Sequence, residues 1–344
     1  MLLPLPIWQH LPLHFKKAVV SNLDFRSRCR LRVCSSAEKG LFDSCSSRIN
    51  FLGINLTQPH FNSPHFPETP AEIFIRDKET KFSKYFNIYE AVEQLLSIFS
   101  NDRVAVDTFH FHVCLFERNG NGFKFFNSFM NGLQTRNITI KVRRLELLTS
   151  FRDKYQFVNF VKYLDVDHIQ SIKLYRAFKY YMDDIVTTDQ WMNLKEFEFE
   201  TRHKFNIDWI THLYKLRLKI ERLSVEAISE LIQSFMIRNP PNGSFFSVST
   251  VLPIIDSRIL LPEIIECFPS PGRNDSIDFK AITGSEIYRH FHSPLHTHKI
   301  PMANSNNVFI AVLSVSNFSG IVCNVDSFEK DLKLLIEKKK VFEK

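Results

Sequence analysis

Apolar residues near the N-terminus recur at the spacing of an amphipathic helix. Leu11, Phe15, Val19 and Leu23 follow one another at four-residue intervals, and the positions between them carry mostly Lys, His and Ser. Pro12 falls in the first turn, where proline is tolerated because the first helical N–H groups have no intrahelical partner. A helix over about residues 11–23 is therefore predicted, with its apolar stripe facing a neighbour.

The segment that follows, residues 25–33, has arginine at every second position from 26 to 32. As a strand it would present four arginines on one face, a surface that suits phosphate groups. As a helix it would place Cys29 and Val33 on one face and spread the arginines around the rest. Asp24 is a favourable N-cap residue, and Arg and Leu favour helices. A second short helix is therefore predicted, with its arginines largely solvated.

The rest of the chain alternates between strand-like and helical patterns. Strands are expected at 49–57, 104–115, 138–148, 169–175, 194–200, 214–220, 245–252 and 308–315. Helices are expected at 88–99, 122–134, 151–164, 180–192 and 224–237. A proline-rich stretch, 58–72, is expected to be a loop or linker.

This alternation favours parallel strands, and their spacing of roughly 20–35 residues lies in the range of solenoid repeats. The predicted fold class is α/β, with a leucine-rich-repeat-like body of alternating strands and helices. An ordinary α/β sandwich is the alternative.

Composition narrows the functional classes only slightly. The chain has 344 residues, a net charge of +7 and 34 Phe, and its basic residues are not gathered into one block. Its six cysteines form no C-x-x-C pair, which fits a reducing compartment. No run of eighteen apolar residues occurs, and the N-terminus lacks the features of a signal peptide. We therefore expect no membrane span and a cytoplasmic or nuclear location.

Two histidine-containing stretches are candidate metal sites. In HFHVC, the side chains of His110, His112 and Cys114 would share one face of a strand. The stretch RHFHSPLHTHK contains His290, His292, His296 and His298. The first set lacks a fourth ligand, and the second is expected to be an exposed loop that tolerates His. No functional metal is therefore predicted.

No catalytic motif rises above noise. The chain lacks G-x-S-x-G, H-E-x-x-H and the glycine-rich phosphate loops of nucleotide-binding folds. We expect a protein that is not an enzyme and that uses no cofactor.

The N-terminal residues resemble a known motif. Leu11-Pro12 opening a helix, the stripe to Leu23, Asp24-Phe25, Leu31 and then Val33-Cys34 are similar to an F-box, in the form common in nematode proteins. The resemblance covers roughly residues 5–45, with Ala37 where the motif has an aromatic residue. It implies a three-helix F-box that binds a Skp-type linker protein. The residues that would make this contact are Leu11, Pro12, Phe15, Val19, Leu23, Phe25, Leu31, Val33 and Cys34.

A second resemblance lies downstream. The segments TTDQWMNLKEFEFE and FNIDWITHLYKLRLKIERLSVEAISELI are similar to the FTH domain, which accompanies the F-box in nematode proteins. The matching residues are Trp191, Trp209, Leu216, Leu218, Ser224 and Glu226. The resemblance is clearest over about 150–320, where IPMANSNNVFIAV is similar to its C-terminal strand.

Together the resemblances imply an F-box at 5–45, connecting strands, loop and helix at 46–99, and an FTH-like repeat body at 100–344. F-box proteins are substrate-recognition adaptors of SCF (cullin–RING) ubiquitin ligases, so the body would bind a target protein. Polar strand residues are the candidates for that contact: His110, His112, Arg143, Lys173, Glu196, Glu198, Arg217 and Lys219.

Two alternatives remain open. One is a nucleic-acid-binding module, because of the net charge and the arginines of 26–32. The other is a repeat scaffold whose F-box no longer engages a ligase, because of Ala37 and a short spacing between Asp24 and Val33.

Overall fold

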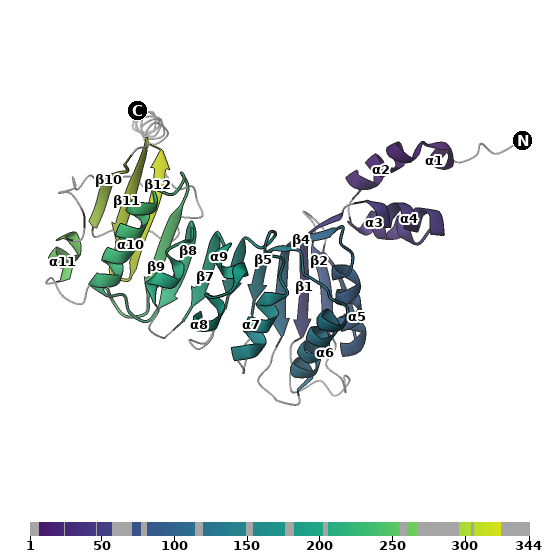
Figure 1. Ribbon diagram of the computed structural model, residues 1–344, viewed down its shortest axis with the longest axis horizontal. Helices are drawn as coiled ribbons and strands as arrows, with labels where there is room; N and C mark the ends of the chain where they lie inside the picture. The colour runs from purple at the N-terminus through teal and green to yellow at the C-terminus, as the bar shows by residue number, and fades with distance from the viewer. Residues whose placement is uncertain are drawn as a thin grey trace, which may run out of the picture. The chain divides into compact units, whose positions relative to one another are not determined.

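The chain folds into two compact units (Figure 1). The computed structural model describes residues 7–23, 25–45, 47–56, 71–76, 81–113, 120–148, 154–175, 182–201, 206–254, 260–266, 268, 296–303 and 306–324. Unit 1 comprises Met1–Tyr175 and Asp183–Asn193, and unit 2 comprises Arg176–Met182 and Leu194–Lys344. The predicted domain boundaries at 45/46 and 99/100 stay predictions.

Unit 1 contains a mixed sheet of six described strands in the order β3-β2-β1-β4-β5-β6. These are β1 Ser47–Leu56, β2 Ala71–Arg76, β3 Lys81–Phe86, β4 Val104–Val113, β5 Val142–Leu147 and β6 Ser171–Leu174. Strands β1, β4, β5 and β6 are parallel, whereas β2 and β3 pair antiparallel. The parallel part is the strand–helix alternation that the sequence predicts.

Helices pack on one face of this sheet and enclose an aromatic core (Figure 1). They include α5 Ile88–Phe99, α6 Asn121–Thr135, α7 Lys154–Lys162 and α9 Asp189–Met192, while α8 Met182–Ile185 spans the division between the units. The ring of Phe111 on β4 lies 5.4 Å from that of Phe160 on α7 and 6.4 Å from that of Phe129 on α6. Trp191 is also fully buried, so the abundant aromatic residues account for much of the interior.

Unit 2 contains six described strands in the order β7-β8-β9-β12-β11-β10. These are β7 Glu196–Glu200, β8 Lys215–Ile220, β9 Phe245–Thr250, β10 His296–Pro301, β11 Asn307–Leu313 and β12 Asn317–Asn324. The first three are parallel, and β9, β12, β11 and β10 pair antiparallel. The described helices of this unit are η2 Ile207–Ile210, α10 Val225–Arg238 and α11 Leu260–Glu266.

The core of unit 2 forms where α10 meets β9, β11 and β12. The ring of Phe246 lies 5.0 Å from that of Phe235 and 5.9 Å from that of Phe309. Gly320 lies beneath these rings, because a Cβ built on it would come within 2.4 Å of the Phe309 ring. A side chain at this position would therefore displace the core aromatics.

Most predicted elements are confirmed within one to four residues, but the helix predicted at 180–192 is two short helices, α8 and α9, and four strands were missed. Residues 71–76 and 81–86 form β2 and β3, and residues 296–301 and 317–324 form β10 and β12. The prediction that RHFHSPLHTHK is an exposed loop is wrong at its C-terminal end, since His298 lies in β10 and is buried beneath the ring of Phe268. The remainder of that stretch and residues 58–70 of the predicted linker lie outside the described residues, whereas residues 71 and 72 of that linker begin β2.

None of the helices that the structure describes combines the length and apolar character needed to cross a bilayer.

Candidate functional site

Four short helices precede the sheet of unit 1, and they share a small apolar core. They are α1 Ile7–His10, α2 Leu13–Asn22, α3 Phe25–Arg32 and α4 Ser36–Ser44. The core consists of Val20, Leu41 and Cys45, with Trp8 and Leu31 packed against it. We call this group of helices the N-terminal module. It confirms the predicted pair of helices at 11–23 and 25–33.

Polar contacts hold the ends of the module in place. The indole Nε1 of Trp8 donates a hydrogen bond to Oε1 of Glu38, at 3.1 Å. The hydroxyl of Ser35 accepts from the backbone N–H of Glu38 and so caps α4. The guanidinium of Arg103 donates to the carbonyl of Ser44 and ties the end of α4 to the residues that precede β4.

Arg28 is an internal clamp of the module. Its Nε donates to the carbonyl of Leu23 at 3.0 Å, and its Nη2 donates to the carbonyl of Ser21 at 2.6 Å. Its exposed fraction is 8%. These carbonyls belong to the end of α2, where helix acceptors lack intrahelical donors. The prediction that the arginines of this segment are largely solvated is therefore wrong for Arg28, although it holds for Arg30.

The apolar face of α2 points away from the core of the module. Phe15 is 55% exposed and Val19 is 42% exposed, whereas Val20 has no exposed surface. A step of one residue turns a helix by about 100°, so the core-facing side of α2 is not the predicted stripe. Phe15 and Val19 in the middle of the stripe are exposed, whereas Leu11 and Leu23 at its ends are half-buried.

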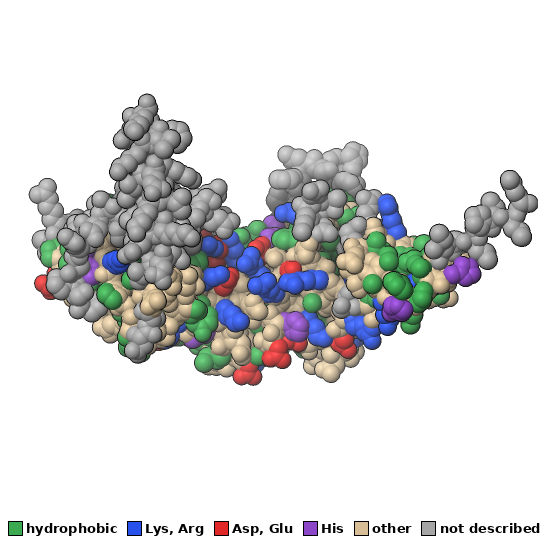
Figure 2. Space-filling view, turned by 90° about the horizontal axis from the view of Figure 1, so that it is seen from above, with side chains coloured by type: hydrophobic (Ala, Val, Ile, Leu, Met, Phe, Trp, Pro, Cys, Tyr) green, Lys and Arg blue, Asp and Glu red, His purple; other side chains and the backbone are tan. Residues whose placement is uncertain are grey.

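Two further apolar residues of the module are exposed. Val33, directly after α3, is 82% exposed, and Leu13, at the start of α2, is 61% exposed. Figure 2 shows the hydrophobic side chains gathered on the N-terminal helices. Leu13 was missed in the sequence because it lies outside the four-residue stripe. Leu13 also lies about 160° around α2 from Phe15, on the side of Val20, so it is not part of the same surface. We call Phe15, Val19 and Val33 the apolar patch.

The other predicted linker-binding residues lie in different surroundings. Leu11, Leu23 and Leu31 are half-buried, and Leu31 packs on the core. Pro12, at the N-cap of α2, and Cys34 are exposed, and the side chain of Phe25 is not described. The structure thus brings Phe15, Val19 and Val33 to the surface and assigns Leu31 mainly to the interior.

Polar strand residues of unit 1 lie on the sheet face opposite the helices. Nδ1 of His110 lies 3.2 Å from Oε2 of Glu146, which is its neighbour on β5. This hydrogen bond lowers the pKa of the Glu146 carboxyl, with a smaller contribution from nearby Lys173. Burial lowers the pKa of His112. Arg143 is exposed at the start of β5 and donates to the amide oxygen of Gln170 at 3.0 Å.

The corresponding residues of unit 2 form a ladder of ion pairs between β7 and β8. Three charge pairs lie side by side in register: Glu196–Lys215 at 2.7 Å, Glu198–Arg217 at 3.7 Å and Glu200–Lys219 at 2.8 Å. Each acid faces a base on the next strand, so this surface is charged but locally neutral.

The candidate metal residues do not form a described site. The rings of His110 and His112 lie 6.3 Å apart, and Cys114, His290 and His292 lie outside the described residues. Within the described ranges, no group of three or more His, Cys, Asp or Glu is arranged to hold a metal ion.

Comparison with known families identifies part of the body. Residues 123–245 match the FTH domain. This FTH segment runs from α6 to the start of β9 and contains the parallel pair β5 and β6 and the parallel pair β7 and β8. It begins and ends earlier than the range of 150–320 expected from the sequence, so residues 300–312 lie outside it. A search of curated proteins found no match.

The residues that carry the resemblance have structural roles in the FTH segment. Trp191 is buried, Leu216 and Leu218 lie on the buried face of β8, and the hydroxyl of Ser224 caps α10 by accepting from the N–H of Ala227. Gln190 donates from Nε2 to the carbonyls of Lys162 and Leu164. Trp191, Leu216, Leu218 and Ser224 thus serve packing and capping in this segment.

Proposed function

We propose that the chain is the substrate-recognition adaptor of an SCF (cullin–RING) ubiquitin ligase. In this proposal residues 5–45 are an F-box of the nematode type that docks on a Skp-type linker, and the leucine-rich-repeat-like body binds a target protein. The adaptor contributes no catalytic group. It acts by raising the local concentration of the target near the charged ubiquitin carrier.

The apolar patch is the observation that carries this proposal. The core of the N-terminal module does not include Phe15, Val19 or Val33, and these three apolar side chains are largely exposed. Apolar residues gathered on the surface of a small helical module are typical of a protein-binding site. The order of this module followed by the FTH segment agrees with the order in F-box proteins of this type.

The nucleic-acid alternative is less well supported by the arginines themselves. Arg28 is buried and donates to backbone carbonyls, and Nε of Arg32 pairs with Asp43 at 2.9 Å. Neither side chain is arranged to contact phosphate groups. Arg30 remains exposed, but one cation contributes little to nucleic-acid affinity.

Co-purification with a Skp-type linker tests the proposal. The full chain and the linker are co-expressed, and affinity is measured by calorimetry for the double variant Phe15→Ser/Val19→Ser. Apolar anchors of this size contribute about 2–4 kcal/mol together, so the dissociation constant should rise by about 30- to 1,000-fold. The matched control is Lys17→Ser/Lys39→Ser, because both lysines are exposed on helices of the same module.

The control variant should bind as the unaltered chain does, and thermal unfolding of the body should be the same for all three proteins. Failure of the unaltered chain to bind the linker would contradict the proposal and favour a repeat scaffold that does not engage a ligase. Salt-dependent binding of random-sequence DNA that weakens when Arg30 is replaced would instead favour the nucleic-acid alternative.

A further inference from the structure

Strand β3 is the outermost described strand of the unit 1 sheet. Its six residues pair in register with β2, from Lys81 opposite Arg76 to Phe86 opposite Ala71, and with no other described strand. One edge of its backbone therefore presents N–H and C=O groups that the described sheet does not use. An edge of this kind can accept an added strand from a partner.

The side chains of this edge are unusually exposed for their type. Phe82 is 51% exposed and Tyr85 is 64% exposed, and every residue of β3 before Phe86 is exposed. Tyr89, in the first turn of α5, is 69% exposed. The end of the sheet thus carries an aromatic surface in addition to its free backbone groups.

A cavity lies directly beside the inner face of β3. It has a volume of about 280 Å³ and is lined by Phe82, Lys84 and Phe86 of β3 and by Ile73 and Ile75 of β2, with Phe42 of α4 contributing to its wall. Apolar side chains form much of the wall, and Ile73 and Phe42 are buried, but the lining also includes polar residues such as Arg32, Asp43 and Gln94. A cavity of this size suits inserted side chains rather than a large ligand.

The charge around the edge is positive. The charged residues of β2, β3 and the cavity lining are four bases and two acids: Arg32, Arg76, Lys81, Lys84, Asp43 and Glu72. Lys81 pairs with Glu72 at 3.3 Å, and Arg32 pairs with Asp43. Arg76 and Lys84 pair with no described carboxylate, and each lies over an aromatic ring, at 5.0 Å from Phe51 and 4.8 Å from Phe86 respectively. Two positive charges are therefore left without a described acidic partner.

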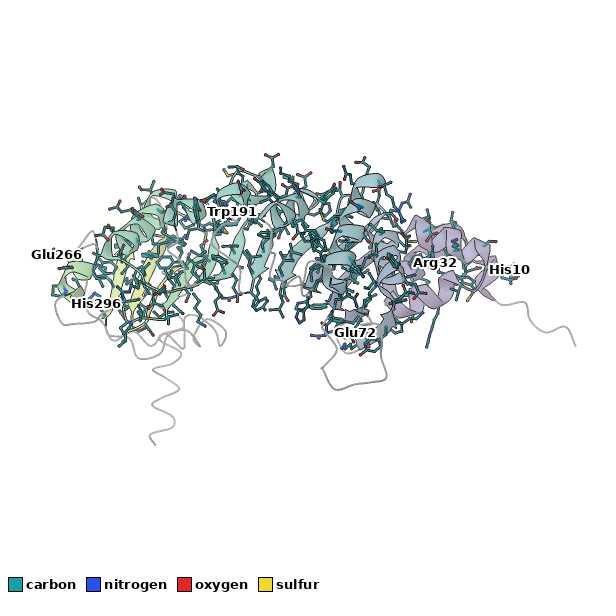
Figure 3. All side chains as sticks on the ribbon, turned by 90° about the horizontal axis from the view of Figure 1, so that it is seen from below. His10, Arg32, Glu72, Trp191, Glu266 and His296 are labelled. Carbon is teal, nitrogen blue, oxygen red and sulfur yellow. The ribbon has the colours of Figure 1, made fainter. Side chains whose placement is uncertain are left out.

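From these observations we propose that the β3 edge binds an extended acidic segment of a partner protein by strand addition. The backbone of the segment pairs with β3, and its side chains alternate between the two faces of the sheet. Its apolar side chains enter the cavity on the face of Phe82 and Lys84, and its carboxylates lie on the opposite face, near Lys81 and Arg76, which are opposite each other in the register. A second copy of this chain is a poorer partner, because pairing two β3 edges would bring four lysines together. Figure 3 labels Arg32 on the N-terminal module and Glu72 on β2, one residue from the cavity-lining Ile73.

A model peptide tests this inference. A fluorescein-labelled peptide of five Val-Glu repeats is titrated with the full chain, and its anisotropy is followed at pH 7.5. We expect saturable binding that weakens as salt is added, since charge attraction is screened by salt. A peptide of five Val-Lys repeats should bind at least tenfold more weakly. A Val-Glu peptide N-methylated at alternate residues should also bind at least tenfold more weakly, because it cannot pair with the strand.

The matched variants are Lys81→Glu and Lys195→Glu. Both replace an exposed lysine, but Lys195 lies before β7 in unit 2. Lys81→Glu should weaken binding at least tenfold, and Lys195→Glu should change it less than twofold. The Phe15→Ser/Val19→Ser variant should bind the peptide normally, so this result is independent of linker docking.

Three outcomes would overturn the inference. They are no binding of the Val-Glu peptide at 1 mM, equal binding to Lys81→Glu, and equal binding of the N-methylated peptide. Sedimentation that shows a dimer dispersed by Lys81→Glu would also overturn it, because the edge would then be occupied by a second copy.

Discussion

Replacing Arg28 should destabilise the N-terminal module. In the sequence this residue cannot be told apart from the three other arginines between residues 26 and 32, but its contacts in the structure set it apart. The variant Arg28→Met keeps a long unbranched side chain and removes the guanidinium. It leaves the carbonyls of Ser21 and Leu23 without the two hydrogen bonds at 2.6 and 3.0 Å. It also removes a positive charge from the C-terminal end of α2, where the helix dipole favours one.

The size of the effect follows from these contacts. Hydrogen bonds from a charged donor contribute about 1.5–3 kcal/mol each. Water can reach the end of α2 once the guanidinium is gone and will replace part of the loss. We therefore expect the module to be destabilised by about 2–4 kcal/mol, which corresponds to a rise of about 30- to 1,000-fold in the equilibrium constant for local opening.

Hydrogen exchange measures this opening directly. Amides of residues 13–32 should exchange faster by that factor in Arg28→Met, while amides of α6 should be unchanged. Arg30→Met is the matched control, because Arg30 is exposed and two residues away, and it should exchange as the unaltered chain does. Equal protection of residues 13–32 in both variants would refute the clamp, and faster exchange in α6 would mean that the module and the body open together.

Two further predictions concern the body. Gly320→Val should lower the midpoint of thermal unfolding, because a Cβ there would lie 2.4 Å from the Phe309 ring. We expect the free energy of unfolding to fall by at least about 2 kcal/mol. The comparison variant Gly40→Ala in α4, where a Cβ meets nothing within 4 Å, should be neutral or slightly stabilising. Burial lowers the pKa of His296, so the folded state takes up this proton at lower pH than the unfolded state does. The free energy of unfolding measured in urea should therefore fall as pH drops below about 6.5, and this part of the pH dependence should disappear in His296→Phe. If the free energy of unfolding of that variant depends on pH as it does in the unaltered chain, the prediction is wrong.

The elements of the parallel part could be predicted because each one carries a clear period. In β7 and β8, buried Phe and Leu alternate with Glu, Lys and Arg, so both the strands and their buried face are visible in the sequence. Asn87 and Glu90 form a capping box at the start of α5, and the beginning of that helix was predicted correctly. Local patterns sufficed where one face of an element is buried and the other is exposed.

The missed strands lack that contrast. Strand β12 is buried at seven of its eight positions, and its buried residues include Ser319 and Asn317, whose side chains hydrogen-bond to each other and to Ser247. Polar residues that are buried in pairs erase the alternation of apolar and polar positions. Strand β3 was missed for the opposite reason, because its aromatic residues are mostly exposed and do not distinguish a buried face from an exposed one.

The candidate site shows the same limit at the scale of one helix. The sequence identifies the stripe of Phe15 and Val19, but periodicity cannot tell whether a stripe faces the chain's own core or a partner. The core side of α2 is instead marked by Val20 alone, one residue away, because the module is too small to bury a second row. A module of this size gains little stability from its own interior. An added surface that covers Phe15, Val19 and Val33 would therefore stabilise α2 as well as bind it, and linker binding and protection of residues 13–32 should rise together.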